Sequence, residues 1–187
     1  MVDDRADLRP PPLPDSQFGV SALAFSSAGL LAAGDADRKT VRFWDPSTGT
    51  ALYSVSPPPG ETASSLAFSP DGTQLAGTFV STNIVRVWSA ATGEQLRVLE
   101  CTPRLHNGRS RQQVAIGPDK RTLAAVTSAG VIRLWDLSTD EPAKVIRVSP
   151  AVSQVDQIAF SPDGRHLATA NNDGTVYILR LGDSSKQ

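Results

Sequence analysis

The chain has 187 residues, a formal net charge of −1, 40% hydrophobic residues and 20% charged residues. This balance gives no support for binding to nucleic acid or to an anionic membrane surface. The one cysteine, Cys101, excludes an intrachain disulfide and predicts a reducing compartment, which we expect to be the cytoplasm. The 14 glycines and 14 prolines are typical of a soluble all-β protein with many turns.

Residues 1–17 are predicted to be a proline-rich tail or linker. They begin with charges of both signs and have no apolar core, so we do not expect a signal peptide. The run RPPPLP at 9–14 favours an extended polyproline helix. We interpret the run as a stiff spacer, and a docking peptide for an aromatic groove is the alternative.

Four segments then repeat one order of elements, at about 20–56, 63–100, 113–149 and 155–181. Each has a short apolar strand, a turn such as SPDG, a second strand of small apolar residues, a polar loop and a third strand. The third strands read VRFWD (41–45), VRVWS (85–89), IRLWD (132–136) and VYILR (176–180). The tryptophans at 44, 88 and 135 are 44 and 47 residues apart, and a period of this size indicates stacked supersecondary units.

Each unit is predicted to be a four-stranded antiparallel sheet of about 40–45 residues. In the SPDG turns, proline presets φ and glycine takes the position that needs a positive φ. Lys120 replaces that glycine in the third unit. The lysine must therefore take a positive φ or the turn must change type, at a cost of order 1 kcal/mol. The fourth unit has no predicted fourth strand before the polar tail at 183–187.

Four copies of the turn and three Trp strands at the same period resemble the WD-repeat β-propeller family, in a divergent, bacterial-type form, over residues 18–182. Family blades usually carry a Gly-His pair, a Ser and an Asp that hydrogen-bond to the Trp. Neither His106 nor His166 stands where that pair belongs, and only Trp44 and Trp135 are followed by Asp. We therefore expect the blades to be held together mainly by apolar packing.

One arginine position recurs in three units, at Arg42, Arg86 and Arg133. A ring of arginines suggests an anion site. The preferred interpretation is that each arginine stem lies along its neighbouring Trp and that each guanidinium extends into water.

The resemblance implies an all-β propeller of four antiparallel blades with about 15 strands, of the four-stranded type, and it leaves the closure of the propeller open. Four blades are few for this family, and the prolines of residues 8–17 would make that segment a poor closing strand. Three outcomes remain: a small four-blade ring, half of a dimeric ring of eight blades, or a partial propeller.

The resemblance also implies a non-enzymatic scaffold that mediates protein–protein interactions through the propeller loops. One alternative is a regulatory or sensor module severed from a larger signalling protein such as a kinase. Another is a propeller hydrolase or lactonase, which the first strands disfavour because they offer no inward-pointing acid or histidine. The sequence contains no zinc spacing, phosphate loop or nucleophile elbow, so we expect no cofactor and no metal.

The irregular insertion at 101–112 is the strongest candidate binding site, because it gathers basic side chains without an acid. It would suit an acidic partner or a phosphate, and a solvated loop is the alternative. Loops that enter the blades or precede the third strands add further candidates. The predicted partner-binding residues are Phe18, Asp35, Asp37, Asn83, Arg104, His106, Arg109, Arg111, Asn171 and Asp173.

Overall fold

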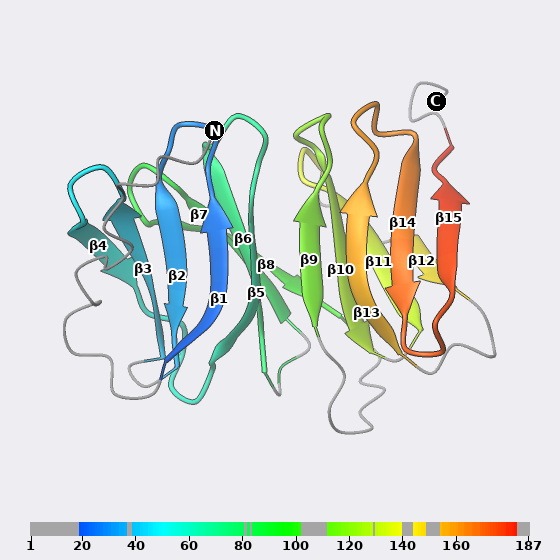
Figure 1. Ribbon diagram of the computed structural model, residues 1–187, viewed down its shortest axis with the longest axis horizontal. Coiled ribbons are helices and arrows are strands. Elements are labelled where there is room, and N and C mark those ends of the chain that lie inside the picture. Colours follow the sequence, from blue (N-terminus) through cyan, green and yellow to red (C-terminus); the bar gives the residue numbers. More distant parts are fainter. Residues whose placement is uncertain are drawn as a thin grey trace, which may run out of the picture.

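The computed structural model describes residues 19–36, 39–80, 82, 84–101, 112–128, 130–139, 144–148 and 154–182. Within these ranges the chain forms 15 strands and no helix, so none of the described segments is a helix that could cross a membrane. The strands make four antiparallel sheets that follow one another along the chain (Figure 1). The predicted tails at 1–17 and 183–187 lie outside the described residues.

Within each sheet, the order of the strands in space is their order in the chain. The first sheet contains β1 (Val20–Phe25), β2 (Leu31–Asp35), β3 (Thr40–Asp45) and β4 (Thr50–Val55). The second contains β5 (Ala63–Phe68), β6 (Gln74–Phe79), β7 (Ile84–Ser89) and β8 (Gln95–Glu100). The third contains β9 (Gln113–Ile116), β10 (Thr122–Ser128), β11 (Val131–Asp136) and β12 (Lys144–Arg147). The fourth contains β13 (Val155–Phe160), β14 (His166–Asn171) and β15 (Val176–Arg180). The predicted all-β fold of repeated antiparallel sheets is confirmed.

The turn between β5 and β6 shows why the SPDG sequence recurs. The Gly72 N–H donates to the Ser69 carbonyl over 2.8 Å, which closes the turn. The Asp71 carboxylate accepts bonds from the Ser69 hydroxyl at 2.6 Å and from the Thr73 N–H at 3.1 Å. Gly72 has a φ of 71°, a conformation that costs glycine little. Each residue type in the turn therefore has its own physical role.

Lys120 keeps the turn of the third sheet at a positive φ of 62°, which confirms the first of the two predicted alternatives. Its N–H donates to the Gly117 carbonyl over 3.0 Å, as the glycine does in the second sheet. The turn geometry is thus retained, and the lysine carries the backbone strain.

The four sheets lie side by side in a row, with the first and the fourth at opposite ends (Figure 1). The first strands make the central contacts, because β1 packs against β5, β5 against β9 and β9 against β13. Three clusters of buried apolar side chains fill the spaces between successive sheets. The small closed ring considered above is therefore wrong for the single chain, which forms a partial propeller.

One docking pattern builds all three interfaces. Leu66 and Phe68 of β5 reach into the first sheet, where they pack with Val41 and Phe43 of β3. The rings of Phe43 and Phe68 meet edge to face, with centroids 6.3 Å apart. The equivalent contacts are Val114 and Ile116 with Val85 and Val87, and Ile158 and Phe160 with Ile132 and Leu134. The first strand of each sheet thus inserts its apolar side chains into the third strand of the preceding sheet.

Replacing Lys120 should test the strain in the third turn. We expect Lys120→Gly to leave the free energy of unfolding unchanged or to raise it, because removing the strain of a positive φ offsets the entropy of glycine. The reverse change at the equivalent position, Gly164→Lys, where φ is 70°, should lower it by roughly 1 kcal/mol. Urea unfolding of both variants measures this. An equal loss of stability in both variants would contradict the assignment of strain to Lys120.

Candidate functional site

The structure describes three of the predicted partner-binding residues, and each makes contacts within its own sheet. Asp35 ends β2 and is buried, with its carboxylate 3.1 Å from the Arg42 guanidinium. Asn171 ends β14, and its side-chain N–H donates to the Thr175 carbonyl at 3.1 Å. Asp173 accepts bonds from the Thr175 N–H at 3.0 Å and from its hydroxyl at 2.6 Å. These three residues hold the polar loops in place.

The remaining predicted residues lie outside the described part of the chain. They are Phe18, Asp37, Asn83, Arg104, His106, Arg109 and Arg111. The basic insertion between β8 and β9 therefore stays a prediction.

Two of the recurring arginines lie against acids and the third is buried, which corrects the prediction that their guanidinium groups extend into water. Arg86 is buried and pairs with Glu61 through two bonds, at 3.0 Å from its Nε and 2.9 Å from its Nη2. Its third nitrogen donates to the Gln95 side chain at 2.9 Å. Arg42 pairs with Asp35 as described, and Arg133 is also buried. Arginine is suited to such pairs because its planar fork matches a carboxylate.

These pairs add buried polar contacts to the apolar packing that we expect to be the main interaction between the blades. Glu61 lies in the connection between β4 and β5, and Arg86 lies in the third strand of the next sheet. Their bidentate contact fixes the connecting loop to that sheet. A buried polar link is therefore present, although it differs from the Gly-His and Asp pattern of the family.

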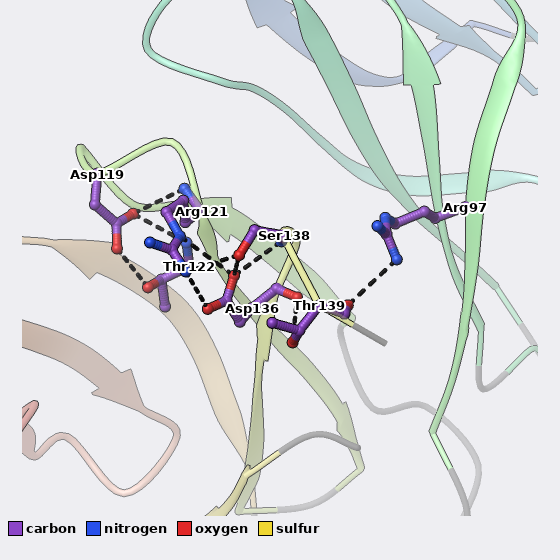
Figure 2. A network of polar contacts seen from close by, with 7 residues as sticks. All are labelled: Arg97, Asp119, Arg121, Thr122, Asp136, Ser138 and Thr139. Carbon is purple, nitrogen blue, oxygen red and sulfur yellow. Dashed lines mark hydrogen bonds and ion pairs between the residues drawn. The ribbon is translucent and has the colours of Figure 1, made fainter. Parts of the chain in front are cut away.

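A polar network covers the turns of the third sheet (Figure 2). The Arg121 guanidinium donates to Asp136 at 2.9 Å and to the Ser138 hydroxyl at 2.7 Å. Asp136 also accepts bonds from the Ser138 hydroxyl at 2.6 Å and from its N–H at 2.8 Å. The hydrogen bond from the Ser138 hydroxyl is the main cause that lowers the pKa of Asp136 to about 2, with help from the Ser138 N–H and Arg121. Asp136 is thus an ionised cap for its own turn.

Side chains of the outer strands also donate hydrogen bonds to the next sheet, close to its turns. Arg97 of β8 donates to the Thr139 carbonyl of the third sheet at 3.3 Å (Figure 2). The Tyr53 hydroxyl of β4 donates to the Ala90 carbonyl of the second sheet. Lys144, at the equivalent position in β12, lines a pocket of about 220 Å³ between the third and fourth sheets. Asp119, Asp136 and Arg180 also line this pocket, so it carries charges of both signs.

Metal chemistry gains no support from this geometry. Within the described ranges, no three His, Cys, Asp or Glu side chains lie close enough together to hold an ion. The aspartates at the turns, Asp71 and Asp163 among them, accept hydrogen bonds from their own turns. The pKa of each of these two carboxyls is lowered, chiefly by the hydrogen bond from the neighbouring serine hydroxyl, Ser69 or Ser161. They are structural groups.

Both ends of the row present apolar side chains to solvent. At one end, Val20, Leu23 and Phe25 of β1 form what we call the leading face, and Leu23 and Phe25 are 60% and 65% exposed. At the other end, Val176 and Ile178 of β15 form the trailing face, at 67% and 71% exposed. Sequence reasoning did not identify these faces as sites. The signal was present, because the repeat positions of Leu23, Phe25, Val176 and Ile178 are apolar in every sheet.

Comparison with known proteins accounts for this repeated pattern. The family model described as "WD domain, G-beta repeat" matches residues 51–89 and 144–179. These two segments match the WD repeat. It is 29% identical over 167 residues to a WD repeat-containing protein, SL1-17, of Schistosoma mansoni, which covers 89% of this chain and 52% of that protein. It is 28% identical over 169 residues to the WD repeat-containing protein VIP3 of Arabidopsis thaliana, which covers 90% of this chain and 41% of that protein. The chain thus spans about half the length of one relative and less of the other.

The two matched WD repeats are out of step with the sheets. Residues 51–89 include most of β4 together with β5, β6 and β7, and residues 144–179 run from β12 into β15. Each matched repeat therefore supplies the outer strand of one sheet and the first three strands of the next. Because one repeat spans two sheets, neighbouring blades are linked through the chain itself as well as by the apolar docking between them.

Breaking the buried ion pair should show how much the WD blades depend on it. We expect Glu61→Ala to lower the free energy of unfolding by about 3 kcal/mol or more, since it leaves the buried Arg86 without its partner. The double change Glu61→Leu with Arg86→Met should recover much of that loss. Arg121→Ala is the control, because its pair with Asp136 is 60% and 39% exposed and should contribute less than about 1 kcal/mol. Equal losses for Glu61→Ala and Arg121→Ala in urea unfolding would contradict this.

Titration of Asp136 by carboxyl NMR should test the turn network. We expect a pKa of about 2 in the wild type, a larger increase in Ser138→Ala and a smaller one in Arg121→Ala. Because the folded pKa lies below the unfolded value, the contribution of Asp136 to stability is present above about pH 4. It is lost as the pH falls through about 2. A larger shift in Arg121→Ala than in Ser138→Ala would contradict the assignment to the serine hydroxyl.

Proposed function

We propose that this chain is a non-enzymatic scaffold that binds other proteins through the loops of its partial propeller. The observation that carries the proposal is the way its loops are fixed to the sheets. Loops at one end of the strands are held by two ion pairs, Glu61–Arg86 and Asp35–Arg42. Turns at the other end of the strands are held by aspartate caps such as Asp71. Loops on a rigid frame give up little conformational entropy on binding, which favours recognition of partners.

The partners in this proposal are other proteins, and a second copy of the chain is one of them. We propose neither nucleic acid nor membrane as a partner, since the formal net charge of −1 supports neither. The proposed compartment is the cytoplasm, where a free thiol such as that of Cys101, which is buried, stays reduced.

The basic insertion is the proposed centre of partner binding. Its three arginines, with His106, would pair with carboxylates or phosphates on the partner. A regulatory or sensor module of a larger signalling protein remains the second candidate, since the chain matches only 52% and 41% of its relatives. A stoichiometric metal in the purified protein, measured by mass spectrometry, would instead favour the hydrolase or lactonase alternative.

Charge reversal in the insertion should test the scaffold proposal. We expect a variant with Arg104, Arg109 and Arg111 all changed to Glu to lose its partners in quantitative affinity capture from cells, with its fold unchanged. The matched control reverses the charge of three exposed arginines outside the insertion and should keep the partners. These are Arg147 and Arg180 on strands and Arg165 in a turn. Equal capture by both variants would contradict the insertion as the binding centre, and no specific capture by the wild type would contradict the scaffold proposal.

A further inference from the structure

Leu23 and Val20 of the leading face occupy positions that are buried in the other sheets wherever the structure describes their equivalents. Leu23 corresponds to Leu66, Val114 and Ile158, which are only 7%, 6% and 7% exposed where they contact a preceding sheet. Val20 corresponds to Ala63 and Val155, which are buried as well. The leading face thus has the side chains of a docking strand and, among the described residues, no sheet in front of it.

The trailing face occupies the matching positions on the receiving side. Val176 corresponds to Val41, Val85 and Ile132, which are all fully buried beneath the next sheet. Ile178 corresponds to Phe43 and Val87, which are also buried. The trailing face therefore has the side chains that receive a docking strand, and no described sheet follows it.

The turns after the first strands also contact the preceding sheet wherever the structure describes one. A Cβ placed on Gly72 would lie 3.3 Å from the Ser26 side chain of the preceding sheet, and one on Gly164 would lie 3.2 Å from Pro118. Gly29 holds the equivalent place in the first sheet, and a Cβ there would meet no described atom within 4 Å. The gap lies on the same side as the leading face, where a preceding blade would stand.

We propose that the leading face of one copy docks on the trailing face of a second copy, and that two copies close into a ring of eight blades. Phe25 of each copy would meet Ile178 of the other, as Phe68 meets Phe43 within the chain. The two faces complement each other and neither complements itself, so the contact is head to tail. A two-fold pair covers both faces of both copies, and eight blades lie within the range that propellers adopt.

A second copy is the occupant that the described residues favour, because the contact repeats a docking pattern already present three times in this chain. The exposed apolar side chains supply the gain in free energy on burial. This inference deepens the proposed scaffold role by naming one partner, and it does not depend on the basic insertion.

The test uses the full chain and light scattering after gel filtration, over a range of concentrations. We expect a wild-type mass of about twice 19.8 kDa. Phe25→Lys alone and Ile178→Asp alone should each raise the dimer dissociation constant at least about thirtyfold, because a charge would face the apolar partner at both contacts. Leu96→Lys and Val145→Asp are the matched controls, since both side chains are exposed on outer strands of the two middle sheets, which carry neither face. Both controls should stay dimeric.

Mixing the two face variants distinguishes head-to-tail pairing from any other dimer. A Phe25→Lys chain and an Ile178→Asp chain together form one unaltered contact and one contact in which Lys faces Asp. We expect the equimolar mixture to recover the dimer that neither variant forms alone. Circular dichroism shows whether each variant is folded. If a variant does not fold, the mass of the wild-type protein tests the inference.

Three results would overturn the inference: a monomeric wild type at every concentration, a dimer that survives either single variant, or a mixture that stays monomeric. A monomer that still captures proteins through the insertion would overturn this inference and leave the scaffold proposal standing. A dimer that captures no other protein would support this inference and overturn the scaffold proposal.

Discussion

The insertion of each first strand into the preceding sheet is the contact on which the rest of the structure depends. A single four-stranded sheet of this size has one apolar set of side chains on each face and cannot bury both alone. Stacking the sheets buries Leu66, Val114 and Ile158 in turn, and the fully buried Phe43, Val85 and Ile132 receive them. Stability in such an array is approximately a sum over neighbouring interfaces, so an unpartnered end costs the chain one interface.

Polar contacts supply what the apolar docking does not. Apolar side chains set the distance between sheets, but they leave the direction of the loops open. The bidentate Glu61–Arg86 contact and the Asp35–Arg42 pair fix loops that have no ladder of their own. A buried pair of this kind adds little net stability over a well-packed apolar pair, so its contribution here is positioning. The carboxylates of Asp71 and Asp136 position the turns at the opposite edge in the same way.

The repeat period, the turn chemistry and the Trp strands were sufficient to predict the all-β fold and the WD-repeat resemblance, and they reduced Lys120 to two alternatives, a positive φ or a changed turn type. These features depend on local sequence, where the residue type determines the backbone conformation. The ion pair of Arg86 was not predicted, because Glu61 lies in an irregular connection whose path follows no periodic pattern. The residues that line the two exposed faces were missed for another reason. Their residues match the buried ones of the other sheets, and only the arrangement in space shows that nothing in the described chain covers them.

One distance within the chain shows whether the sheets form an open row with two separated apolar faces. Spin labels on cysteines introduced by Leu23→Cys and Ile178→Cys, in a chain diluted with excess unlabelled protein, report the separation of the two faces by pulsed electron resonance. The account predicts a single long distance, because the faces lie at opposite ends of the row. A short distance would contradict it and would mean that the four blades close on themselves.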